Sequence, residues 1–109
     1  MARFMILVCG DAGDASATEL GGRTARQAEW IGKLRSAGVL ADGGRIGGDS
    51  LRIRSAIDRP AVIDIPPDAI GAARSWLMLE VIDLASAVAI AESCPEAVYG
   101  DVRVVPVDV

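Results

Sequence analysis

The stretch Trp76-Leu77-Met78-Leu79-Glu80-Val81-Ile82 is apolar at every position except Glu80. A short and almost unbroken apolar run predicts a strand with both faces shielded from water. Strands of an antiparallel sheet ordinarily alternate, because one face of the sheet stays wet. Residues Phe4–Cys9 form a second run of the same kind. Together the two stretches predict a sheet that is covered on both faces.

The rest of the chain supplies the partners of these two strands. We expect helices over 23–37, ended by Gly38, and from an N-cap at Asp83, along a buried face of Leu84, Ala87, Val88 and Ala91, to just before Pro95. Further elements are expected as strands over 39–42 (interrupted by Gly43-Gly44), 51–54, 61–65 and 102–107, a loop over 11–22 and one helical turn over 68–73. Residues 51–54 and 61–65 are expected to pair as a hairpin. This order predicts an α+β, ferredoxin-like fold, with an antiparallel sheet and two helices on one face.

The exposed face of that sheet predicts a partner. The length of 109 residues indicates one domain spanning 1–109. The face away from the helices would carry Trp76 and Met78, together with Phe4, Ile6 and Val8 or their alternates, which is more apolar surface than a monomer tolerates. A second copy of the chain is the simplest cover. We therefore expect a homodimer through the sheet face, a dimeric α+β barrel, enclosing a cavity for a small molecule.

Composition argues against several classes of function. The net charge is -4, aromatic residues make up 4%, and the arginines are dispersed, so no nucleic-acid partner is expected. The chain has no histidine, and Cys9 and Cys94 lack metal-ligand spacing, so neither a metal site nor a histidine-activated nucleophile is expected, and no cofactor is implied. No apolar run approaches the roughly 18 residues of a membrane span, so we expect no membrane partner and a cytoplasmic location.

Without histidine, proton transfer at neutral pH needs another group. Asp64, within Val62-Ile63-Asp64-Ile65-Pro66-Pro67, ends an apolar strand, where desolvation would make a carboxylate a stronger base. A structural explanation stays open, because Asp and Pro are common at strand ends. Tyr99, the only tyrosine, is the candidate neutral partner. Arg45, after Gly43-Gly44, is a candidate for orienting an anionic or carbonyl-bearing substrate.

The strand that contains Trp76 supplies two more candidates. Trp76, Met78 and Glu80 share one face by period two, so Trp76 and Glu80 are expected to line a ligand cavity. A carboxylate on that face is costly to bury unless it is paired. Glu80 is therefore expected to be either a member of an inter-subunit salt bridge or an acid in the pocket.

Five segments carry a resemblance that runs nearly end to end. They are RFMILVCGDAG, LRSAGVLADGGRI, LRIR followed by RPAVIDIPP, WLMLEVIDLASAVAIAESCP, and VRVVPV. Together they resemble the YCII-related, or DGPF-domain, family, which implies a dimeric α+β barrel of ferredoxin-like units. The family's Asp-Gly-Pro-Phe falls on residues 64–67, where Asp64 and Pro66 match while Ile65 and Pro67 differ. Some members resemble lyases that use a His-Asp pair. The His would fall near Arg26 or Gln27, which makes Gln27 a candidate ligand hydrogen-bonding group.

Two functions follow from these observations. The first is a small-molecule enzyme or pocket protein of the YCII-related type, with lyase, isomerase or cyclase-like acid–base chemistry by Asp64 in a dimer cavity. The alternative is a non-catalytic dimeric binding or accessory module that has lost the family's catalytic His. The retained Asp64 favours the first, whereas the missing His and the altered motif favour the second.

Overall fold

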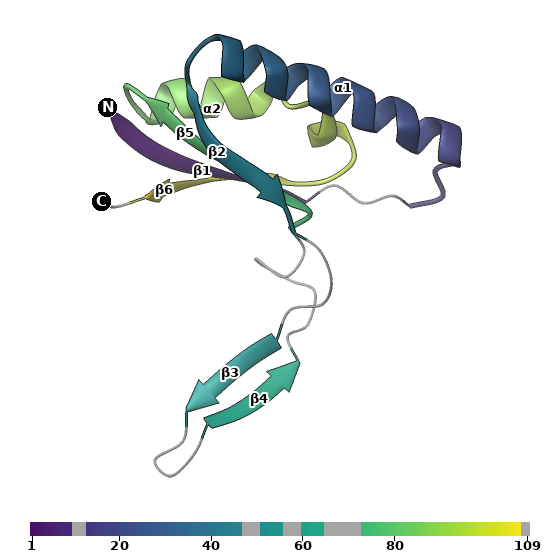
Figure 1. Cartoon of the computed structure of the whole chain (residues 1–109), viewed down its shortest axis with the longest axis vertical. Coiled ribbons are helices and arrows are strands. Elements are labelled where there is room, and N and C mark those ends of the chain that lie inside the picture. The colour runs from purple at the N-terminus through teal and green to yellow at the C-terminus, as the bar shows by residue number, and fades with distance from the viewer. Residues whose placement is uncertain (10–12, 47–50, 56–59, 65–72, 108–109) are drawn as a thin grey trace.

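A computed structural model describes residues 1–9, 13–46, 51–55, 60–64 and 73–107, and for 51–55 and 60–64 only the course of the backbone. Its elements are β1 (Ala2–Val8), α1 (Ala17–Ser36), β2 (Leu40–Arg45), β3 (Leu51–Ser55), β4 (Pro60–Asp64), β5 (Ser75–Val81), α2 (Leu84–Glu92), the 3-10 helix η2 (Pro95–Val98) and β6 (Val102–Val107). Four strands form an antiparallel sheet in the order β2-β5-β1-β6. Both helices lie on one face of it (Figure 1). The predicted ferredoxin-like α+β fold is confirmed.

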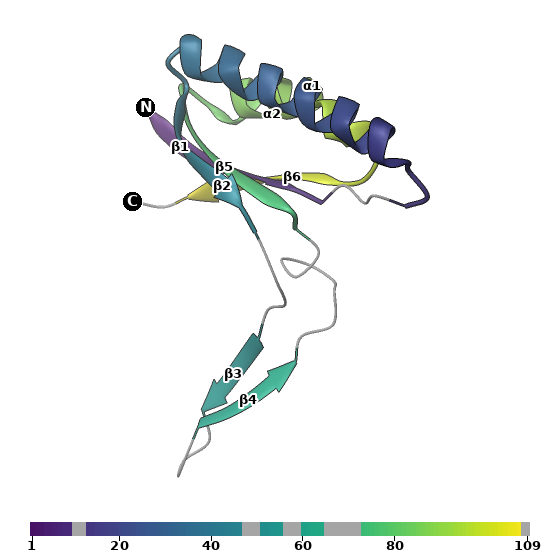
Figure 2. The same ribbon diagram turned by 45° about the vertical axis from the view of Figure 1, so that its right-hand side comes forward.

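The hairpin β3–β4 is inserted between β2 and β5. Its register pairs Leu51 with Asp64 and Ser55 with Pro60, as the predicted hairpin requires, and Ile65 lies outside the described residues. In two views the hairpin lies apart from the four-stranded sheet (Figures 1 and 2). The hairpin is therefore an addition to the ferredoxin-like order of elements, because the sheet is complete without it.

The core lies between the sheet and the helices. Phe4, Ile6 and Val8 of β1 face the helices and pack with Trp30 and Leu34 of α1. They alternate with residues that face the other way, and the same alternation holds in β5. The helix-facing residues of β5 are Leu77, Leu79 and Val81, whose burial completes this core.

The opposite face of the sheet carries a second set of apolar residues, which we call the open face: Met5, Leu7, Trp76, Met78, Val105 and Val107. The register places Met5 beside Met78 and Leu7 beside Trp76. Leu7 is buried, with only 5% of its surface exposed, whereas Val105 is 40% exposed. Of the elements that the structure describes, neither helix covers this face (Figure 2). Apolar residues thus lie on both sides of β1 and β5, and the described elements cover only one of these sides.

α1 begins at Ala17, so the prediction of a loop over 11–22 and a helix from residue 23 was wrong for this part of the chain. Ser16 is the N-cap, and its hydroxyl accepts a hydrogen bond from the backbone N–H of Glu19, 3.1 Å away. Ser-x-x-Glu is a capping pattern that starts a helix. Gly21-Gly22 lowers helix propensity by about 1 kcal/mol per residue relative to alanine, but the cap and the packing of the later turns outweigh it.

The end of α1 follows the prediction. Gly38 has a φ of +75°, which a residue without a side chain adopts at little cost. The backbone N–H of Gly38 donates to the carbonyl of Arg35, and that of Val39 donates to the carbonyl of Leu34. This pair of bonds is the Schellman arrangement that closes a helix and turns the chain back into β2.

Gly43-Gly44 does not interrupt the strand as predicted, because β2 continues through both residues to Arg45. A Cβ on Gly43 would lie 3.0 Å from the Leu77 side chain, and one on Gly44 would lie 3.1 Å from the indole nitrogen of Trp76. The two glycines therefore let side chains of β5 lie closely against each face of the edge strand.

The second helix is only partly as expected. Asp83 caps α2, and Ala87 and Ala91 are buried, but Leu84 and Val88 are 50% and 37% exposed. The small alanine side chains alone make the buried stripe of this nine-residue helix. The predicted helical turn over 68–73 lies outside the described residues except for Ala73, which is in neither a helix nor a strand. The terminal strand forms as predicted, at the edge of the sheet.

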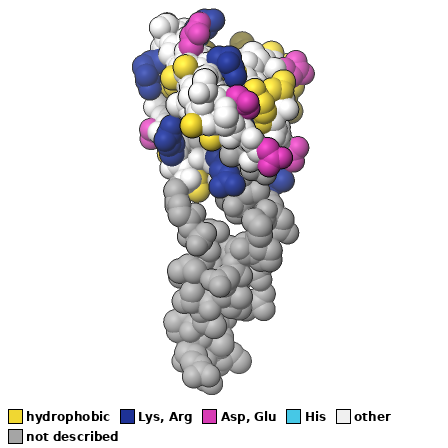
Figure 3. All heavy atoms as spheres, turned by 90° about the vertical axis from the view of Figure 1, so that its right-hand side faces the viewer, with side chains coloured by type: hydrophobic (Ala, Val, Ile, Leu, Met, Phe, Trp, Pro, Cys, Tyr) yellow, Lys and Arg dark blue, Asp and Glu magenta, His cyan; other side chains and the backbone are white. Residues whose placement is uncertain are grey.

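The surface mixes charges of both signs. In the space-filling view, acidic and basic side chains are interspersed over the described residues (Figure 3). Glu29 and Lys33, one turn apart on α1, are 3.6 Å apart and about three-quarters exposed, at 70% and 75%. Such exposed pairs contribute little to stability. No helix among the described residues is long and apolar enough to cross a membrane.

We expect Asp83→Ala to lower the melting temperature, because the cap of α2 is lost. Hydrogen bonds from the backbone N–H and hydroxyl of Ser86 lower the pKa of the Asp83 carboxyl. Its ionised form therefore stabilises the fold above the ordinary pKa, and this contribution is lost as the pH falls through the lowered pKa of the folded state. Thermal melts followed by circular dichroism from neutral pH down to about pH 2 should show the difference from wild type shrinking. Asp83→Asn is the control, since it keeps an acceptor oxygen without a charge; equal melting of all three proteins at neutral pH would contradict the role of the cap.

Candidate functional site

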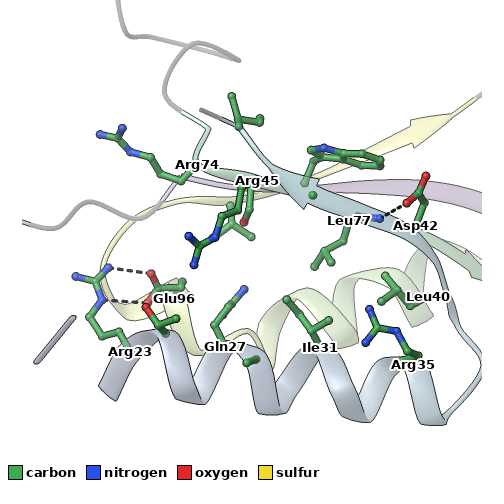
Figure 4. A pocket seen from close by; sticks show the side chains of 18 of the residues that line it. Arg23, Gln27, Ile31, Arg35, Leu40, Asp42, Arg45, Arg74, Leu77 and Glu96 are labelled. Carbon is green, nitrogen blue, oxygen red and sulfur yellow. Dashed lines mark hydrogen bonds and ion pairs between the residues drawn. The ribbon is translucent and has the colours of Figure 1, made fainter. Parts of the chain in front are cut away.

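A cavity of about 830 Å³ lies between α1 and the edge of the sheet formed by β2 and β5. It is lined by Val8, Arg23, Thr24, Gln27, Ala28, Ile31, Arg35, Leu40, Ala41, Asp42, Gly43, Gly44, Arg45, Ile46, Arg74, Ser75, Trp76, Leu77 and Glu96. The helix forms one wall and the two strands form the other (Figure 4). The volume is that of a typical small-molecule site.

One stripe of α1 forms the helical wall. Arg23, Gln27, Ile31 and Arg35 are spaced four residues apart, so they lie along the same side of the helix. Ile31 gives the middle of this wall an apolar surface, and the longer polar side chains stand before and after it (Figure 4). The cavity is therefore apolar at its centre and polar toward its ends.

Gln27 is the polar group on this wall with an unmet hydrogen bond. Its Oε1 accepts from the Cys94 thiol over 3.6 Å. Its Nε2 is buried and has no hydrogen-bond partner among the residues that the structure describes. Burial raises the pKa of the Cys94 thiol, so that residue stays a neutral donor to the amide. An unmatched buried donor is uncommon in folded proteins and calls for an explanation.

The sheet wall presents Arg45 to the helix. Gly43 and Arg45 face α1, whereas Gly44, between them, faces the side on which Trp76 lies. Arg45 is paired in register with Ser75, which also lines the cavity. In the close view Arg45 extends from β2 and Gln27 rises from α1 toward the same space (Figure 4). Two groups that carry only donors at their ends, a guanidinium and an amide nitrogen, thus face one another across the cavity.

An ion pair closes one end of the cavity. Nε and Nη2 of Arg23 donate to the two carboxylate oxygens of Glu96 over 3.1 and 2.9 Å. Arg23 is 5% exposed, and its guanidinium lies 3.7 Å from the centre of the Tyr99 ring. A hydrogen bond from Arg26 to the Tyr99 hydroxyl, 3.4 Å long, adds to this end. The pair joins α1 to η2, and both of its charges are compensated within the protein.

The other carboxylate at the cavity is also engaged. Asp42 accepts a hydrogen bond from the backbone N–H of Gly43 over 2.8 Å. Its carboxylate is directed away from α1 (Figure 4). Among the described residues that line the cavity, Asp42 and Glu96 are the only carboxylates, and both accept hydrogen bonds in this arrangement.

The structure brings three of the six candidates from the sequence to this cavity, and Tyr99 is not among its lining residues. Gln27 and Arg45 lie on facing walls, and Trp76 lines the cavity with its indole nitrogen beside Gly44. Glu80 shares the open face with Trp76 but does not line the cavity, and its carboxylate is 2.8 Å from the guanidinium of Arg3 in the same chain. Asp64 is the last residue of β4, and its side chain lies outside the described residues. The catalytic role of Asp64 and the binding roles of Gln27, Arg45, Trp76 and Glu80 stay predictions.

Sequence reasoning missed Arg35, Arg74, Ser75 and the buried Arg23–Glu96 pair. The four-residue spacing from Arg23 to Arg35 was a usable signal, because all of these residues lie within the helix predicted over 23–37. The Arg23–Glu96 contact spans 73 residues, so no local pattern indicates it. No group of three or more acidic, Cys or His residues suited to a metal ion occurs within the described ranges.

The structure resembles that of 5-chloro-2-hydroxyhydroquinone dehydrochlorinase from Burkholderia phenoliruptrix, solved in complex with 2,5-dihydroxybenzoquinone. The TM-score is 0.54 and the sequence identity is 17%, over 94% of this chain and 89% of that chain. At this identity the similarity supports the fold and not the activity. No protein-family model and no curated protein matches the chain.

We expect Arg23→Met to destabilise the protein by about 3 kcal/mol, because Glu96 would be left with a largely buried, unpaired charge. Adding Glu96→Leu should recover most of that loss, since the double variant has no uncompensated charge. Urea denaturation of the two single variants and the double variant, read as a double-mutant cycle, measures the coupling. Strictly additive losses would contradict the pairing.

Proposed function

We propose that this chain is a small-molecule enzyme or pocket protein of the YCII-related type. The observation that carries the proposal is the cavity of about 830 Å³, in which Gln27 and Arg45 converge from facing walls. A concave space with an apolar middle and a few convergent polar groups is the usual form of a ligand site. The structural neighbour, an enzyme solved with a quinone bound, supports the suitability of this fold for small-molecule chemistry.

The chemistry that we propose is acid–base catalysis of the lyase, isomerase or cyclase kind, with Asp64 as the acid or base. Both carboxylates that line the described cavity are engaged, Glu96 by Arg23 and Asp42 by the backbone of Gly43. An acid–base group must therefore come from another part of the chain. Asp64, at the end of β4, is the residue that the resemblance assigns to this task.

A non-catalytic binding module is the second candidate. It is favoured by the lack of a histidine near Arg26 or Gln27, where the resemblance would place the catalytic one. An amide donates and accepts hydrogen bonds but does not exchange a proton near neutral pH. In this alternative the cavity holds its ligand through Gln27 and Arg45 without transforming it.

We further propose that two copies pair through the open face. The face combines four half-buried apolar residues with Val105, which is 40% exposed, and no described element covers it. Covering it with the same face of a second copy would bury both sets at once and form a dimeric α+β barrel. The Arg3–Glu80 pair, at 47% and 41% exposed, would lie at the rim of such a contact, where charges are tolerated.

Trp76→Glu should produce a monomer, because a carboxylate on the open face would lose its hydration in the dimer without gaining a partner. Light scattering should then report a mass near 11.3 kDa instead of twice that value. Val98→Glu is the matched control, since Val98 is 80% exposed on η2 and outside the open face, and it should leave the dimer intact. A Trp76→Glu protein that stays dimeric would place the interface elsewhere.

Asp64→Asn should leave the assembly intact and lower turnover by at least about a hundredfold, since the amide cannot act as an acid or base. The first probe is 5-chloro-2-hydroxyhydroquinone, the substrate named for the structural neighbour, followed by its change in ultraviolet absorbance. Asp101→Asn, an exposed position after η2, is the control. Equal turnover by wild type and Asp64→Asn removes Asp64 from the mechanism, and no turnover by wild type favours the binding module.

A further inference from the structure

The two facing donors at the cavity restrict what it can hold. Arg45 and Gln27 point from opposite walls into the same space (Figure 4), and the buried Nε2 of Gln27 has no hydrogen-bond partner among the described residues. We infer that the cavity takes a small organic anion with an apolar body: a carboxylate or enolate that Arg45 binds, with a second oxygen that accepts from Gln27. This inference rests on the proposal that the cavity is a ligand site.

The positive charge of the side chains that line the cavity supports an anionic ligand. Arg35, Arg45 and Arg74 line it, and no described carboxylate forms an ion pair with any of them. The Arg23–Glu96 pair adds no net charge, and Asp42 is directed away from α1. The whole chain, in contrast, has a formal charge of -4. A positive cavity on an acidic protein attracts small anions and orients them as they enter.

Gln27 supplies the second point of recognition. Its Nε2 is screened from water in the unliganded arrangement, and the opposite end of the amide is held only by a thiol 3.6 Å away. Thiols are weak donors, and the terminal torsion of glutamine is soft. A small rotation of the amide therefore brings Nε2 to a ligand oxygen at little cost and ends its unsatisfied state.

The apolar walls in the middle of the cavity favour a ligand with an apolar body. Between the polar ends, the walls are formed by Ile31 of α1 and by Leu40 and Leu77 of the strands. These side chains contact flat or aliphatic groups well and offer no hydrogen bonds. A hydroxy- or oxo-substituted aromatic or unsaturated acid meets all three requirements.

Three probes, whose binding to the wild-type protein is measured by calorimetry, test the need for the charge and for the second oxygen separately. We expect 4-hydroxybenzoate, with both oxygen groups, to bind at least tenfold more tightly than 4-hydroxybenzamide, which lacks the charge, and several-fold more tightly than benzoate, which lacks the second oxygen. Arg45→Gln should remove the preference for the acid over the amide. Arg103→Gln, an exposed arginine on β6 outside the cavity, should preserve it.

Gln27→Met tests the second contact and has a readout in the free protein. It should remove the preference for 4-hydroxybenzoate over benzoate while raising the melting temperature by roughly 4 °C or more, because a buried unmatched donor is replaced by an apolar group of similar size. A fall in melting temperature would overturn the role of Gln27 as a donor kept for a ligand.

The outcomes for the inference differ from those for the proposed function. If the amide probe binds as tightly as the acid, or if no probe binds, the inference about an organic anion is overturned. The proposal of a small-molecule enzyme would still be supported in either case if Asp64→Asn abolishes turnover of the quinol probe that wild type sustains. If Arg45→Gln still prefers the acid over the amide, the inference is also overturned, since a group other than Arg45 would then recognise the charge.

Discussion

The pairing of β1 with β5 is the constraint on which the rest of the structure depends. Each strand places apolar side chains on alternate faces in register, so Ile6 and Leu77 lie against the helices while Leu7 and Trp76 lie on the other side. This central pair decides where α1 and α2 can pack. It also leaves an apolar face that the described part of the chain does not cover. The cavity lies at the edge of this layer, where β2 and α1 diverge.

Most of the fold could be predicted, because local patterns in the sequence indicate its helices and strands. Unbroken apolar runs marked β1 and β5, and the Asp83 cap and the Gly38 turn marked helix ends. The start of α1 was missed because Gly21-Gly22 obscured the Ser16 cap. β2 was cut short because glycines in a strand suggest a break, whereas here their role depends on Trp76 and Leu77 of the neighbouring strand. Local patterns hold no information about such a neighbour.

The candidate site was predictable only in part, for a related reason. Gln27 and Arg45 were singled out from the resemblance and from residue type, and they do meet at one cavity. The ion pair of Arg23 with Glu96 engages one of the two described carboxylates at the cavity, yet its partners are far apart in sequence. Long-range pairing of this kind leaves no local pattern. The proposed binding, in contrast, rests on the donor groups of Gln27 and Arg45, whose residue types are visible in the sequence.

The glycines of β2 have a consequence for local stability. An edge strand with no side chains at positions 43 and 44 is held chiefly by its backbone hydrogen bonds to β5. Such a strand is expected to detach before the central pair does when the protein opens locally. Arg45 lies on this strand, so each opening also takes the guanidinium out of the cavity. The proposed ligand, bound by Arg45, should therefore slow the hydrogen exchange of the β2 amides.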